Sequence, residues 1–139
     1  MRRLVLLSVV CVFLEGCGTL GLFTRTHISV LSGFEEQPFV VPDSVASGEV
    51  FTVIVYTVEP CDWPGPPRVE IEGNVATITP YSSYLTPREE DCHFSYTTAF
   101  VHEATIQFTE KGQATIFLRV RLDEANREPH LLRRTLRVY

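Results

Sequence analysis

The sequence has little positive charge for its length. Its 139 residues include 12 Lys and Arg against 17 Asp and Glu, which gives a formal net charge of −5 at pH 7. A general nucleic-acid binder needs a net basic surface, because binding neutralises phosphates and releases their counterions. The composition therefore gives no reason to expect a nucleic-acid partner.

Recognisable catalytic motifs are also missing. The sequence contains no GxSxG, HExxH, SxxK or P-loop pattern, each of which marks a nucleophile, a zinc site or a phosphate cradle. Cysteine occurs only four times, and no two cysteines have the close spacing typical of zinc sites. We therefore expect no enzymatic activity, no cofactor and no bound metal.

Long apolar runs are missing after the first 16 residues. The exception at the start is residues 4–14, eleven uncharged residues that follow Arg2 and Arg3. Such a run is too short for a transmembrane helix, which needs about 20 residues. A short basic start followed by a short apolar run is typical of a signal peptide. We predict that residues 1–16 are a signal peptide and that the protein is exported.

The junction after this run, Leu14-Glu15-Gly16-Cys17, resembles the lipobox of bacterial lipoproteins. The resemblance implies cleavage before Cys17, a diacylglycerol on its thiol and an acyl chain such as palmitate on the new amine. Two or more chains anchor a protein stably in a membrane. In that family, Gly18 fits sorting to the outer membrane. The alternative is an ordinary secretory signal cut near Gly16 or Gly18.

Two cysteines remain if Cys11 leaves with the signal peptide and Cys17 is lipidated. These are Cys61 and Cys92, and an exported domain enters an oxidising compartment. We expect one structural disulfide between them, which would stabilise the fold by about 3–4 kcal/mol in the loop-entropy model. A catalytic or metal-binding thiol is the alternative.

The remaining chain predicts a single all-β domain. Residues 17–26 are expected to be the lipidated cysteine and a short tether, and residues 27–139 the domain. Period-two alternation and β-branched residues predict strands over residues 50–58, 68–72, 74–79, 96–108, 113–121 and 131–139. The strands at 96–108 and 113–121 are expected to form a hairpin. About seven or eight short strands, without helical periodicity, favour a β-sandwich.

Two segments resemble parts of bacterial immunoglobulin-like (Ig-like) domains. In residues 41–53, a strand led by Pro42 precedes a turn at Gly48 and an alternating strand; in residues 112–120, an alternating strand follows Gly112. The resemblance covers most of residues 38–139 and implies an Ig-like sandwich. Because such folds host adhesion, carrier and inhibitor roles alike, it implies no particular activity.

His102 lies at an apolar position of its strand, between Phe100 and Ala104. This placement favours a hydrogen-bonded core histidine over a metal ligand or a general base. His93 is nine residues away, an odd spacing that would put the two imidazoles on opposite faces of one continuous strand. A shared metal site is therefore not favoured.

The segment 61–67 is expected to be an exposed loop, because its three prolines remove donors from a strand ladder. It contains Trp63, the only tryptophan. Trp63 with Tyr81 and Tyr84 is the candidate contact surface for a partner. The alternative is that Trp63 covers the disulfide or one end of the core.

The arginines of the last strands form a second candidate surface. Arg119 and Arg121, and likewise Arg133 and Arg137, are expected to face outward, whereas Arg134 takes the inward parity. A solvated sheet face is favoured over an anion-binding site.

Together these features predict a non-enzymatic lipoprotein, tethered to the membrane and acting as a binding or structural module of the cell envelope with a protein or envelope partner. The alternative is a small periplasmic inhibitor or metal carrier with the same fold.

Overall fold

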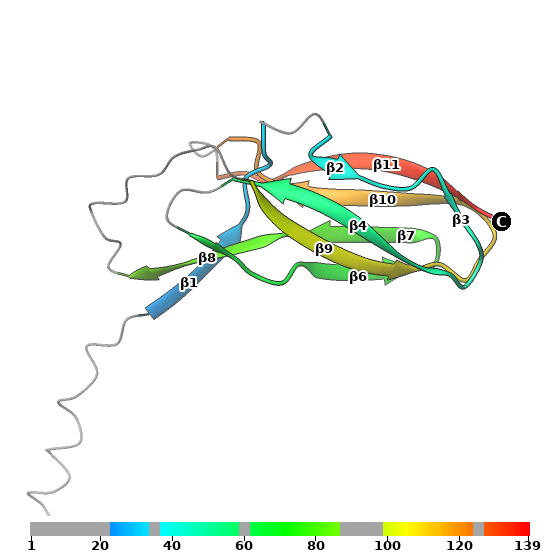
Figure 1. Cartoon of the computed structure of the whole chain (residues 1–139), viewed down its shortest axis with the longest axis horizontal. Coiled ribbons are helices and arrows are strands. Elements are labelled where there is room, and N and C mark those ends of the chain that lie inside the picture. Colours follow the sequence, from blue (N-terminus) through cyan, green and yellow to red (C-terminus); the bar gives the residue numbers. More distant parts are fainter. Residues whose placement is uncertain (1–22, 34–36, 59–61, 87–98, 124–126) are drawn as a thin grey trace, which may run out of the picture.

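The computed structural model describes residues 23–33, 37–58, 62–86, 99–123 and 127–139. Within these ranges it contains eleven strands and no helix, which confirms the predicted all-β class (Figure 1). The count exceeds the expected seven or eight mainly because three of the strands are only two residues long. Such short pieces carry too few residues to show an alternating pattern in the sequence.

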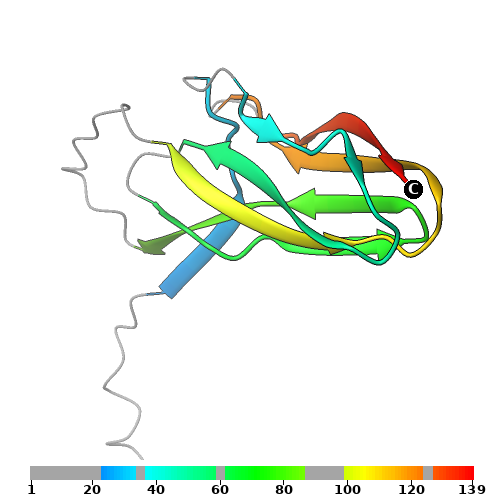
Figure 2. The ribbon, with the colours of Figure 1, turned by 45° about the vertical axis from the view of Figure 1, so that its right-hand side comes forward.

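Two of the three sheets pack against each other as the layers of a sandwich (Figures 1 and 2). The first has the order β2 (Phe39–Val40), β4 (Val50–Thr57), β9 (Phe100–Gln107). The second has the order β3 (Ser44–Val45), β11 (His130–Val138), β10 (Gly112–Val120), β7 (Val75–Thr79), β6 (Arg68–Glu72). This second sheet is mixed, because β10 runs parallel to β7 and β11 runs parallel to β3.

The core lies between these two layers and follows from the alternation in the sequence. Val53 and Val55 from one sheet and Ile116 and Leu118 from the other are fully buried. Phe108 is fully buried as well, with its ring centroid 5.9 Å from that of Phe51. Each such side chain contributes about 1.5–3 kcal/mol by leaving water.

The predicted hairpin of β9 and β10 is wrong, although both strands exist. They lie in different sheets, and the chain between them crosses from one layer to the other. Both strands carry an apolar face, and stacking face to face buries those faces against each other. The crossing is held by Gly48, whose N–H donates to the Phe108 carbonyl at 2.8 Å, and by the Ser47 hydroxyl, which donates to the Thr109 carbonyl at 2.7 Å.

A long, kinked hairpin supplies strands to two sheets. Its tip, β6 and β7, belongs to the sandwich, and its base, β5 (Trp63–Pro64) and β8 (Tyr81–Thr86), belongs to the third sheet. The register shifts by one residue between Trp63↔Ser83 and Arg68↔Thr79, so the proline-rich arm carries one extra residue. This is the pattern of a β-bulge, which bends and twists a strand. On the other arm, buried Pro80 separates β7 from β8.

The third sheet begins with β1 (Phe23–Ile28), which pairs with β8 in antiparallel register. Residues 23–26, which the sequence analysis assigned to the tether, form ladder pairs with residues 83–86. This short segment has too few apolar residues to predict a strand, and its pairing depends on β8, far along the chain. β1 lies at one end of the molecule and the C-terminal residue at the other (Figure 1).

Candidate functional site

Buried polar side chains gather where the third sheet meets the sandwich. His102 on β9 is 2% exposed. Its Nε2 lies 2.8 Å from the Thr57 hydroxyl on β4, and its Nδ1 lies 3.1 Å from the Gly65 carbonyl at the kink of the hairpin. His102 therefore joins the two strands of one sandwich layer to the segment that leads into the third sheet.

The hydrogen-bond partners of His102 indicate which of its ring nitrogens carries a proton. A carbonyl oxygen only accepts, so Nδ1 carries a proton and donates to Gly65. In the neutral ring, Nε2 is then an acceptor, and the Thr57 hydroxyl donates to it. Both ring nitrogens are thus engaged within the protein, as expected for a hydrogen-bonded core histidine.

A second polar pair lies within the third sheet. His27 Nε2 on β1 is 3.1 Å from Oδ2 of Asp62, the residue before β5, and the Asp62 side chain is fully buried. The His27 side chain is 24% exposed and its ring centroid lies 5.5 Å from that of Tyr84. A buried carboxylate is costly without a polar or charged partner, which His27 supplies. This pair connects β1 to the start of β5 across β8.

The chain that follows β1 is tied to both sandwich layers. The hydroxyls of Ser29 and Ser82, both fully buried, lie 2.6 Å apart. The Arg121 guanidinium donates through Nε to the Ile28 carbonyl at 2.7 Å, and the backbone N–H of Val58 donates to the Val30 carbonyl at 2.9 Å. These hydrogen bonds link the chain that follows β1 to β8 and to the residues directly after β4 and β10.

The three candidate aromatic residues all lie in the third sheet, but they do not share one face. Trp63 is paired with Ser83, and Tyr84 is the next residue along β8. Neighbouring residues of a strand point to opposite faces, so Trp63 and Tyr81 lie on one face and Tyr84 on the other, beside His27. The three aromatic rings therefore do not form a single surface.

The prediction of a loop over residues 61–67 is wrong at Trp63 and Pro64. Trp63 and Pro64 form a two-residue strand at the edge of the third sheet, and both are exposed. An edge position agrees with the argument from proline, which excludes only a central strand.

The predicted arginine surface is present, but only some of its arginines lie where the sequence placed them. Arg119, Arg133 and Arg137 are exposed at the outward positions of β10 and β11, as expected. Arg121 is half-buried and turned to the Ile28 carbonyl. Arg134 is exposed although it has the inward parity. The outward arginines lie beside half-buried Phe117, which pairs with Arg133.

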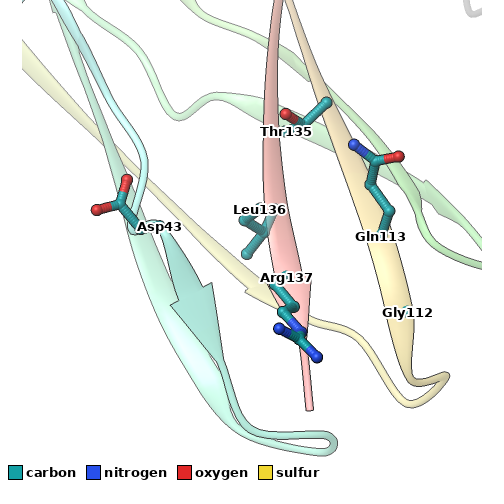
Figure 3. A pocket seen from close by; sticks show the side chains of 6 residues that line it. All are labelled: Asp43, Gly112, Gln113, Thr135, Leu136 and Arg137. Carbon is teal, nitrogen blue, oxygen red and sulfur yellow. The ribbon is translucent and has the colours of Figure 1, made fainter.

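An open hollow of about 490 Å³ lies beside the end of this surface. Its lining residues come from the turn before β3 and from β10 and β11: Asp43, Gly112, Gln113, Thr135, Leu136 and Arg137 (Figure 3). The Asp43 carbonyl there accepts a hydrogen bond from the Arg137 backbone N–H at 3.0 Å.

Several predicted site residues lie outside the described ranges: Cys17, Cys61, Cys92 and His93. The part of the chain that is described contains no group of three His, Cys, Asp or Glu side chains arranged to hold a metal ion. Nor does that part contain a helix with the length and apolarity to cross a membrane.

The polar residues His27, Ser29, Asp62 and Ser82 were not singled out from the sequence. They are isolated polar residues in different segments, and only the pairing of β1, β5 and β8 brings them together. No protein-family model, curated protein or solved structure matches this chain.

Proposed function

We propose that this protein is a membrane-anchored, non-enzymatic module of the cell envelope, held by lipid on Cys17. The observation that carries the proposal is the position of strand β1, which begins at Phe23, with five residues (18–22) between Cys17 and that strand. Six backbone steps span no more than about 22 Å. A lipid on Cys17 would therefore hold the domain close to the bilayer, with the rest of the sandwich extending away from it.

The sandwich has features of an Ig-like arrangement, which we propose as its architecture. A three-stranded antiparallel sheet packs on a larger sheet, and the first strand of the sandwich is divided between them as β2 and β3. The parallel pairing of β7 with β10 departs from the wholly antiparallel sheets of the standard fold. We regard it as a variant of that architecture.

A binding or structural role is supported by the contacts that the two described core-side histidines, His102 and His27, make within the protein. His102 donates and accepts hydrogen bonds within the core, and His27 contacts Asp62. These contacts hold strands together and leave the imidazoles engaged. We further propose that Cys61 and Cys92 form a disulfide, which would close the segment containing the kinked hairpin.

The anchor is tested by expressing the full chain with its own N-terminus in a bacterial host fed labelled palmitate. The Cys17→Ser variant is expected to lose the label and move from the membrane to the soluble fraction. The Cys11→Ser variant is the matched control, because it changes a cysteine of the apolar run and leaves Leu14-Glu15-Gly16-Cys17 intact; it should behave as the wild type. Label retained by Cys17→Ser would refute the anchor.

A further inference from the structure

We propose that one face of the third sheet lies on the lipid headgroups of the membrane that holds Cys17. This open face is defined by the residues that share the parity of Trp63 and are at least partly exposed: Thr24, Thr26, Ile28, Trp63 and Tyr81. The inference rests on the proposed lipid anchor and adds to it a specific contact with a lipid surface.

The first argument is reach. Trp63 pairs with Ser83, and Ser83 pairs with Thr26, so Trp63 lies two strands across and three residues along from Phe23. With a rise of about 3.3 Å per residue and about 4.8 Å between strands, the two Cα atoms are about 14 Å apart. Trp63 therefore lies within about 36 Å of Cys17 even when the segment from Cys17 to Phe23 is fully extended, whereas the C-terminal residue lies at the far end of the molecule (Figure 1).

The second argument is the chemistry of the open face. Thr24, Thr26 and Trp63 are all exposed, and Trp63 is 43% exposed on an edge strand. Tryptophan is favoured at membrane–water interfaces, because its ring is apolar and its indole N–H still finds a polar partner. None of the side chains that define this face is charged, which suits contact with headgroups.

The third argument is charge. The chain has a net charge of −5, yet the open face carries no carboxylate. An acidic protein is repelled by anionic lipids unless acidic groups are kept away from the contact. The exposed Arg25 has the opposite parity to Thr24 and Thr26, so it lies on the other face of this edge strand. Anionic headgroups thus meet a face that carries no charged side chain.

The opposite face of the same sheet differs in its chemistry. It carries the exposed Arg25, the contact between His27 and fully buried Asp62, and the fully buried Ser82. Of the two faces, the one that carries Trp63 is therefore the one without charged groups. A protein partner on Trp63 is the competing occupant, and the experiment separates the two.

The test uses Trp63 as the only tryptophan of the chain. The lipidated full-length protein is reconstituted into vesicles of phosphatidylethanolamine and phosphatidylglycerol that contain lipids brominated near the headgroup end of the acyl chain. The matched reporter is the Trp63→Phe, Tyr139→Trp double variant, which moves the indole to an exposed position at the far end of the domain. Matching urea midpoints establish that both proteins are folded.

We expect Trp63 emission to be blue-shifted and quenched several-fold more strongly than that of the reporter at position 139. Thr26→Glu, which places a carboxylate on the open face, should lower the quenching of Trp63, whereas Thr105→Glu, at an exposed position of β9, should not. Equal, weak quenching at both positions in lipidated protein would overturn this inference and leave the anchor intact. Protein recovered without lipid would overturn the anchor and the inference together.

Discussion

His102 and Thr57 are joined across neighbouring strands, with Nε2 of the ring 2.8 Å from the threonine hydroxyl and both side chains buried. The other ring nitrogen donates to the Gly65 carbonyl, at the bend of the long hairpin. The imidazole of His102 therefore connects β4 to the bend of the hairpin that leads into the third sheet.

We expect Thr57→Val to lower the free energy of unfolding by about 1–2 kcal/mol, because the isosteric change leaves Nε2 of His102 buried without that donor. Thr52→Val is the control, since Thr52 is exposed on the same strand. Urea denaturation of the two variants measures the difference. Equal midpoints for both would show that the hydrogen bond contributes nothing to stability.

His27→Ala should lower the free energy of unfolding by about 1–3 kcal/mol, because it leaves the buried Asp62 carboxylate without its contact to the imidazole. Adding Asp62→Asn to that variant should restore part of the loss, since the charge that needed a partner is gone. Hydrogen exchange of the β1 amides would report the effect locally. Strictly additive losses would argue against coupling between the two side chains.

The exposed pair of Arg68 and Glu70 offers a comparison for that experiment. Its charged atoms lie 2.8 Å apart, but both side chains are more than half exposed. Solvent and salt screen such a pair, so Glu70→Gln should change the free energy of unfolding by less than about 0.5 kcal/mol. A loss as large as that of His27→Ala would contradict the distinction between buried and exposed pairs.

The crossing between the two layers depends on Gly112, whose φ is +130°. Residues with a side chain rarely adopt this backbone conformation, so Gly112→Ala should lower the free energy of unfolding by about 1–3 kcal/mol. Gly33→Ala is the matched control, because a Cβ at Gly33 would meet nothing within 4 Å. Thermal unfolding of the two variants tests this prediction; equal melting temperatures would mean that the backbone at Gly112 adapts without strain.

The outward arginines of β10 and β11 should behave as a solvated surface. We expect Arg119→Gln and Arg133→Gln each to change the free energy of unfolding by no more than about 0.5 kcal/mol. Inorganic phosphate should stabilise the wild type and these variants equally in a thermal shift assay. Stabilisation seen in the wild type and lost in Arg133→Gln would instead identify an anion site.

The strands and the core could be predicted from the sequence because the alternation of apolar and polar residues lies within each strand. The alternation that predicts residues 50–58 also buries Val53 and Val55, and the predicted strands at 68–72, 74–79, 113–121 and 131–139 are all present. Alternation specifies which face is apolar but not which strand lies beside it. For that reason β9 and β10 were expected to pair, although they lie in opposite layers.

The candidate site was less predictable because it depends on contacts between distant segments. Asp62 and His27 are 35 positions apart, and neither lies in a recognisable motif. The parity of Trp63 and Tyr84 depends on the register of β5 and β8, which the bulge in the proline-rich arm shifts by one residue. His102 was the exception, since its place among apolar residues of its own strand already indicated a buried, hydrogen-bonded ring.

The most direct test of the anchor is the intact mass of protein recovered from bacterial membranes, measured with and without reductant. The proposal predicts residues 17–139 carrying a diacylglycerol and an amide-linked acyl chain, with a gain of two hydrogen atoms on reduction of the Cys61–Cys92 bridge. An unlipidated chain, or one that begins at a residue other than Cys17, would contradict the central claim.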